Sequence, residues 1–202
     1  MKTSMKSLIA TGLIALSCTC SAFATPTADQ LANEIGQYRG FYTLYAGLPI
    51  SDYKVNWSNV PGWKLVEHRV GREPLTARES RYATDFYERS YEINGKQVLE
   101  KVDVCVNLNK DFVDSFGWSL ESRSRDVIDE VGMKIQRNLT KAYARARYLK
   151  PWHYTDPTIR RPYFYTTSEG KGKITFYGII DDEKDKANPI YRVVLVHSFE
   201  TL

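Results

Sequence analysis

The side chains that could carry nucleophilic or metal chemistry are few and widely spaced. Cys105 is the sole cysteine after residue 24, and the three histidines are His68, His153 and His197. A cysteine nucleophile needs a base that is close in space, whatever its distance along the chain. No His-x-x-x-His or Cys-x-x-Cys pair follows residue 24, so the spacing predicts no zinc site. We therefore assign no catalytic residue, no metal ligand and no cofactor, and a Cys105–histidine pair stays open as an alternative.

Carboxylates are numerous enough to include the acid–base pair of a glycan-cleaving enzyme. Such a pair needs two carboxylates ~5–10 Å apart, a distance that spacing along the chain does not give. The candidates are Glu67, Asp85, Glu88, Asp103 and Asp156. The acidic run 181–189 lacks the alternating acids, central glycine and closing glutamate of an EF-hand, and is typical of a solvated loop between strands.

The segment 150–165 combines aromatic, basic and proline residues. Trp, Tyr and Arg contribute most of the binding energy at protein interfaces, and they also stack on sugar rings. We therefore expect a binding loop here, with the candidates Trp152, His153, Tyr154, Arg160 and Arg161. The alternative is that Trp152 and Tyr154 cover the end of a helix and that the two arginines are solvated.

The first 24 residues have the three-part layout of a bacterial-style secretory signal peptide. Lys2 and Lys6 precede an apolar run over 8–16, and the small residues of a peptidase site follow at 22–24. The apolar run is shorter than the ~20 residues that span a bilayer, and no later segment is long enough. We expect a mature protein that begins at Thr25, resides in the periplasm or is secreted, and has no transmembrane anchor.

The overall composition is that of a folded, water-soluble chain. It has 202 residues, of which 43% are hydrophobic, 26% charged and 13% aromatic. Loss of the two leader lysines lowers the formal charge of +4 by two. That balance is too even to predict a nucleic acid as a partner.

A β-hairpin is the clearest structural signal in the chain. Asn94-Gly95 separates two strand-like runs, 82–93 and 97–108, and this dipeptide favours the tight turn of a hairpin. In the second run, valines alternate with polar residues, which indicates a strand with one buried face. A further strand is expected over 112–120, with Phe116 and Trp118 as core residues.

Helical spacing appears twice, at 27–38 and from Ser124 to about 148, where Pro151 follows. Short extended pieces are expected at 53–57 and 63–70. The C-terminal part predicts three strands over 163–167, 173–180 and 190–199, the last of them central because it is apolar on both faces. These elements predict a single α+β domain over 25–202. In it, a mainly antiparallel sheet, formed by the hairpin and a C-terminal three-strand meander, is packed by an N-terminal helix and one long central helix.

No motif specifies a reaction, so function is inferred by class. Export, a single domain and the absence of a catalytic motif favour a non-enzymatic protein of the bacterial envelope that binds another protein. An immunity-type inhibitor of an envelope-acting toxin or enzyme fits this profile. The alternatives are an exported cell-wall hydrolase, using a carboxylate pair or Cys105 with a histidine, and a structural or small-ligand-binding component of the envelope.

Overall fold

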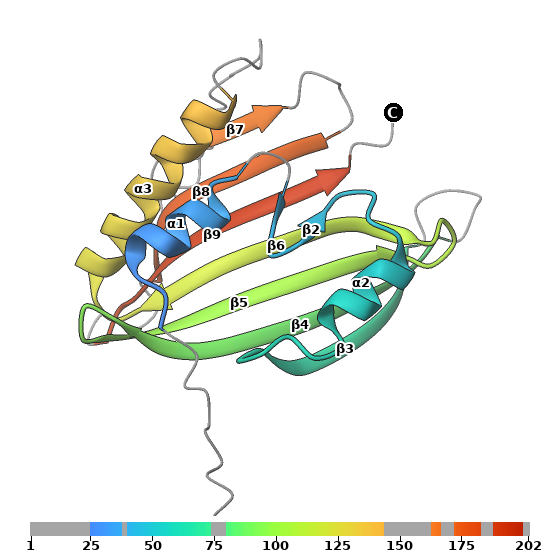
Figure 1. Cartoon of the computed structure of the whole chain (residues 1–202), viewed down its shortest axis with the longest axis horizontal. Helices are drawn as coiled ribbons and strands as arrows, with labels where there is room; N and C mark the ends of the chain where they lie inside the picture. The colour runs from blue at the N-terminus through green and yellow to red at the C-terminus, as the bar shows by residue number, and fades with distance from the viewer. Residues whose placement is uncertain are drawn as a thin grey trace, which may run out of the picture.

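Figure 1 shows the protein as a long curved sheet with helices packed against it. This computed structural model describes residues 25–37, 40–73, 80–143, 163–166, 172–182 and 188–199. The expected leader, 1–24, lies outside the described residues. The sequence-based prediction of an α+β fold with a mainly antiparallel sheet is confirmed.

The main sheet has seven strands in the order β3-β4-β5-β6-β9-β8-β7, and every neighbouring pair is antiparallel. The strands are β3 (Lys64–Glu73), β4 (Ser80–Ile93), β5 (Lys96–Asn107), β6 (Phe112–Ser122), β7 (Tyr163–Thr166), β8 (Gly172–Asp182) and β9 (Ile190–Phe199). The short strands β1 (Gly40–Phe41) and β2 (Leu44–Tyr45) form a separate pair. As predicted, β9 is central, because it lies between β6 and β8.

The turn between β4 and β5 has the geometry that its sequence predicts. Asn94 and Gly95 both have positive φ, 52° and 70°, and Ile93 pairs with Lys96 across the turn. Positive φ at both central positions gives a turn whose twist matches that of the flanking strands. The two longest strands of the sheet are thereby held in one register.

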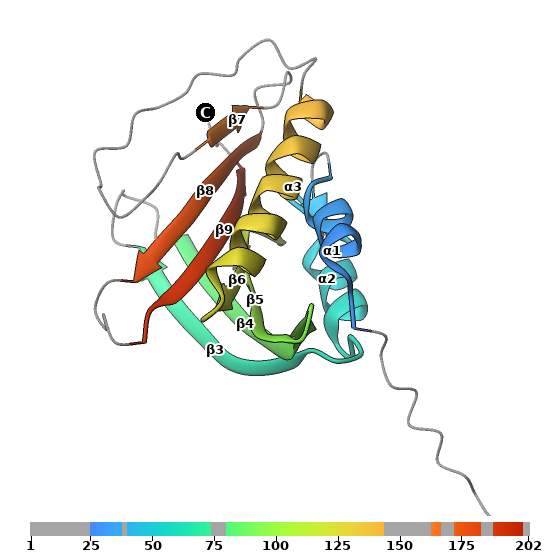
Figure 2. The same ribbon diagram turned by 90° about the vertical axis from the view of Figure 1, so that its left-hand side faces the viewer.

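Figure 2 shows the three helices of the described residues on the same side of the sheet. We call this the helix side and the opposite face the outer side. Helix α1 (Ala28–Ile35) begins at a capping box, in which Thr27 and Gln30 exchange hydrogen bonds. Helix α3 spans Arg125–Tyr143, and the predicted continuation to 148 lies outside the described residues.

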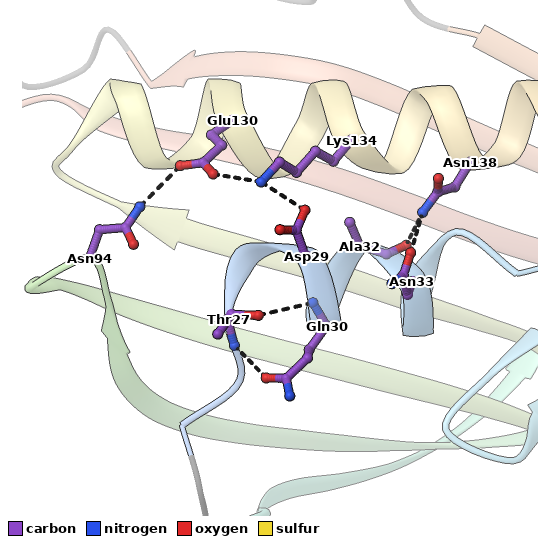
Figure 3. A network of polar contacts seen from close by, with 9 residues as sticks. All are labelled: Thr27, Asp29, Gln30, Ala32, Asn33, Asn94, Glu130, Lys134 and Asn138. Atoms are coloured by element: carbon purple, nitrogen blue, oxygen red, sulfur yellow. Dashed lines mark hydrogen bonds and ion pairs between the residues drawn. The ribbon is translucent and has the colours of Figure 1, made fainter.

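Helices α1 and α3 are joined by polar contacts, drawn in Figure 3. The Lys134 ammonium lies 2.8 Å from Asp29 on α1 and 2.7 Å from Glu130 on its own helix. Asn138 donates to the carbonyl of Ala32 at 3.1 Å. The polar face of α3 therefore fixes α1, while the apolar face of α3 is buried.

The prediction of an extended piece at 53–57 is wrong. These residues belong to helix α2 (Ile50–Trp57), which buries Ile50, Tyr53 and Trp57. That spacing of three and four residues places all three side chains on one helical face. Pro49 stands directly before the first helical residue, where a fixed φ and a missing N–H are tolerated.

The core lies between the helices and the sheet. It contains Phe116 and Trp118 of β6, each 1% exposed, as the sequence predicts. The buried residues of α3 belong to the same cluster; they are Val127, Ile128, Val131, Ile135 and Leu139. His197 of β9 is also buried in this region, where its ring stacks on Phe116 with the centroids 4.7 Å apart.

Candidate functional site

The helix side of the sheet is exposed at its β3 edge. Strand β3 pairs with β4 so that Leu65 lies opposite Tyr87, His68 opposite Asp85 and Val70 opposite Ala83. Leu65 is 51% exposed and Val70 is 60% exposed. Large apolar side chains exposed together on a sheet are typical of an interaction surface.

We define the β3–β4 face as these exposed β3 residues together with the polar and aromatic side chains beside them. Its members are Trp63, Leu65, His68, Val70, Asp85 and Arg89. A β-bulge between Leu65 and Glu67 sets the orientation of the residues that follow, because Val66 has no partner residue on β4. As a result His68 and Val70 point to the helix side.

A histidine–aspartate pair lies at the centre of the β3–β4 face. His68 Nδ1 is 2.5 Å from Asp85 Oδ1, and the His68 side chain is 53% exposed. On the buried side, the Tyr53 hydroxyl donates to Asp85 Oδ2 at 2.6 Å and lies 2.9 Å from the Tyr87 hydroxyl. Asp85 therefore orients the imidazole through its Nδ1 atom.

The environment keeps Tyr53 and Tyr87, the two tyrosines of this hydrogen-bonded network, protonated. Burial raises the pKa of Tyr53 far above its usual range, and the hydrogen bond to Asp85 raises it further. Burial also raises the pKa of Tyr87. The hydroxyl of Tyr53 is thus a fixed hydrogen-bond donor to the carboxylate and not a source of negative charge.

Two residues beyond Tyr87 along β4, Arg89 faces Glu100 of β5. The Arg89 Nε donates to Glu100 Oε2 at 2.6 Å, and the glutamate is completely buried. Tyr42 and Tyr91 donate their hydroxyls to the same carboxylate at 2.8 Å, and Trp118 donates its indole N–H at 2.6 Å. All of these groups are donors, and together they give each carboxylate oxygen two hydrogen bonds.

Aromatic rings surround the Arg89 guanidinium. Its central carbon lies 4.6 Å from the ring centroid of Trp63, 5.2 Å from that of Tyr91 and 5.3 Å from that of Tyr42. Burial alone would lower the pKa of Arg89, but Glu100 and Tyr42 raise it above its ordinary value. The Arg89 side chain is still 20% exposed, so a permanent positive charge is available at the rim of the face.

The sequence predicts a binding loop in the segment 150–165. Its candidate binding residues lie outside the described residues; they are Trp152, His153, Tyr154, Arg160 and Arg161. Among those described, Cys105 is on the outer side of β5, whereas His68 and His197 are on the helix side. Burial raises the pKa of the Cys105 thiol, which lowers its content of nucleophilic thiolate. The geometry therefore gives Cys105 no histidine partner in this part of the chain.

The candidate carboxylates are distributed over both sides of the sheet. Asp85 is on the helix side, while Asp103 is on the outer side, where its carboxylate covers Gly117. Glu67 is exposed and paired with Arg69. Among the residues that the structure describes, no three metal-ligating side chains come together. Asp156 lies outside the described residues.

A hollow of about 370 Å³ lies at the end of the sheet near the β4–β5 turn. Its lining residues include Lys96, Gln97, Glu121 and Arg123, although most of the lining surface is apolar. The Glu121 carboxylate is already engaged by Lys101 at 3.0 Å and by Arg192 at 2.7 Å. We therefore take the β3–β4 face, and not this hollow, as the candidate site.

The sequence contains two signals of this site. A helix-side position in a strand of alternating valines is occupied by Glu100, which indicates a buried charge that needs a partner. Alternation over 82–93 also places Asp85, Tyr87, Arg89 and Tyr91 on one face. The partners Tyr42, Trp63 and His68 come from other elements, and no local spacing connects them.

Comparisons with known proteins give no relative for this chain. No family model matches it, and neither does any curated protein or any solved structure. None of the helices that the structure describes combines the length and the apolar character needed to cross a membrane.

Proposed function

We propose that the chain is an exported, non-enzymatic binding protein of the periplasm or the extracellular space, and that its β3–β4 face binds another protein. This proposal rests on the exposure of Leu65 and Val70 on β3, together with the Arg89 guanidinium that lies among aromatic rings on β4. Apolar area supplies the affinity of such a contact, and a half-buried arginine among aromatic rings is the residue environment in which binding energy concentrates.

The arrangement suits a protein partner better than a small ligand. Leu65, His68 and Val70 lie on an open strand surface, and small ligands are usually bound in concave pockets. Arg89 is preorganised by Glu100 and by the rings around it, so little side-chain entropy is lost when a partner's carboxylate meets it. An inhibitor of an envelope-acting toxin or enzyme, of the immunity type, is the functional class that we propose.

The test uses two exposed positions whose replacement does not disturb the core. The double variant Leu65→Asp/Val70→Asp is compared with wild type and with Val55→Asp, because Val55 is 76% exposed on the outward surface of α2. Proteins retained from envelope extracts are identified by mass spectrometry, and their affinity is then measured with purified components. We expect the double variant to lose about 30-fold or more in affinity while Val55→Asp binds normally.

An unchanged melting midpoint in the double variant shows that the loss is not a loss of folding. Equal retention by the double variant and by wild type would contradict the proposed face. If substitutions at Trp152 or Arg160 lower the affinity instead, the interface lies on the segment 150–165.

The His68–Asp85 pair favours a second function on the same face, that of an acid–base catalyst acting on an envelope glycan or peptide. An exposed imidazole that is oriented by a carboxylate has the geometry of a general acid–base catalyst. His68→Gln should then abolish the release of fragments from purified cell wall, while the melting midpoint stays unchanged. If the wild-type protein releases no fragments from cell wall, this second function is contradicted.

A further inference from the structure

Strand β3 forms one edge of the main sheet. In the part of the chain that the structure describes, β4 is its one neighbouring strand, so the other edge of β3 presents backbone N–H and C=O groups without a strand partner. The strand has ten residues and no proline. Natural proteins usually shorten or block such an edge, because it pairs readily with another strand.

The side chains along this edge are exposed. Val66 is 44% exposed and Val70 is 60% exposed. The side chains of Glu67 and Arg69 are 44% and 64% exposed. The bulge at Val66 bends the strand, and its pairing with β4 is regular from Glu67 onward. The five residues Val66–Val70 form one exposed segment of this edge.

The order of these five residues is self-complementary. The sequence reads Val66-Glu67-His68-Arg69-Val70, so an apolar residue, an acid, a histidine, a base and an apolar residue follow one another. When such a strand pairs with an identical antiparallel strand centred on His68, each acid faces a base and each Val66 faces a Val70. Opposite charges placed directly across two strands favour their pairing, and like charges oppose it.

We propose that a second copy of this chain pairs with β3 in this register, about a two-fold axis that passes through His68 perpendicular to the sheet. A two-fold axis in this direction places the helix sides of both copies on the same side of the joined sheet, and their outer sides on the other. Glu67 and Arg69 lie opposite Phe86 and Thr84, on the outer side, so both cross-copy ion pairs form there. The pairing joins the two main sheets into one.

This dimer places the β3–β4 faces of the two copies side by side, with Val70 of each copy at the junction, facing Val66 of the other. The inference does not rest on the proposed protein partner, because the charged pairs are on the outer side and the β3–β4 face is on the helix side. A symmetric partner would meet two adjacent faces, and linked sites of this kind bind more tightly than either does alone.

Charge reversal tests the register. The mature protein is examined by analytical ultracentrifugation over a range of concentrations, together with Glu67→Arg, with Arg69→Glu and with an equimolar mixture of these two variants. In the proposed register each variant alone places like charges across the axis, and we expect its dimerisation constant to fall at least ~10-fold. In the mixture, opposite charges face each other again, so the dimer should return as a heterodimer.

If Glu67 and Arg69 act only within one copy, mixing the two variants should not restore the dimer, because each folded variant keeps its own charges. That result overturns the proposal, and so does a wild-type protein that is monomeric at all concentrations. Melting midpoints of the variants verify that they are folded.

A covalent test checks the position of the axis independently. His68→Cys in a Cys105→Ser background should form a disulfide-linked dimer on mild oxidation, because the two residues on the axis have Cβ atoms ~5 Å apart. Val55→Cys in the same background is the matched exposed control and should stay monomeric. Equal cross-linking of the two cysteine variants also overturns the proposal. The charge variants Glu67→Arg and Arg69→Glu change side chains on the outer side, away from the β3–β4 face, so they should leave the affinity for a protein partner unchanged. Failure of one proposal is thereby distinguishable from failure of the other.

Discussion

Arg89 and Glu100 face each other across β4 and β5, with 2.6 Å between the guanidinium Nε and a carboxylate oxygen that has no access to solvent. An acid in this position is stable only while its hydrogen-bond donors remain. Removal of one partner leaves a buried charge, which is more destabilising than removal of both charges.

A double-mutant cycle measures this dependence. Arg89→Met should lower the free energy of unfolding by about 3–5 kcal/mol, because Glu100 is then buried without its cation. Adding Glu100→Gln should recover part of that loss, since the amide still accepts from Trp118 and carries no charge. Urea denaturation of the four proteins gives the coupling, and additive losses would contradict the proposed dependence.

His197 should make the protein sensitive to acid. Burial lowers the pKa of His197 to about 3, below the value of about 6.5 for an exposed histidine. The unfolded chain therefore takes up a proton below pH 6.5 that the folded chain refuses, and stability falls as the pH falls toward 3. The slope from this one group reaches ~1.4 kcal/mol per pH unit.

His197→Phe removes this contribution and leaves a ring that can still pack against Phe116. Between pH 7 and pH 4.5 the wild type should lose about 2–3 kcal/mol more stability than the variant. Denaturant titrations at the two pH values give the difference, in which the other titrating groups cancel. If wild type and variant lose the same stability between pH 7 and pH 4.5, His197 is not the cause of the acid sensitivity.

Cys105 should react slowly with thiol reagents. Burial raises the pKa of its thiol, so little thiolate is present at pH 8. Reaction with a chromogenic disulfide should be at least ~10-fold faster in denaturant than in the folded protein. Comparable rates in the two states would restore Cys105 as a candidate nucleophile.

Gly36 marks the closest approach of α1 to α3. A Cβ atom there would lie 2.6 Å from the Cβ of Asn138 and 2.7 Å from the carbonyl oxygen of Ala32. Gly36→Ala should therefore cost about 1–3 kcal/mol in unfolding free energy, as overpacked substitutions do. Gly71→Ala is the control, because nothing lies within 4 Å of its Cβ, and it should change stability by less than ~0.5 kcal/mol. Similar losses in both variants would contradict the close approach.

Sequence reasoning predicted the elements that have local signals. The Asn94-Gly95 turn is confirmed because positive φ at both positions is a property of those two residues. The central position of β9 follows from its apolar character on both faces. Helix α2 was missed because no side chain caps its N-terminus, and because Pro49 before it reads equally well as part of a turn.

The candidate site was not predicted because it depends on pairing between strands. His68 and Asp85 are seventeen residues apart and meet through the register of β3 with β4. Without the bulge at Val66, alternation from Leu65 would place His68 on the outer side of the sheet, away from Asp85. A one-residue irregularity of this kind has no reliable signature in a single sequence.

The position of β9 determines when the fold can be completed during synthesis. Chains emerge from the ribosome N-terminus first, and β6 finds its second neighbour only when residues 190–199 have been made. Until then the pairing groups of β6 are exposed beside the side chains of Trp118 and Leu120, which later lie next to Leu195 and Val193. A chain without residues 190–199 is therefore expected to present an unpaired sheet edge at β6, and such an edge favours aggregation.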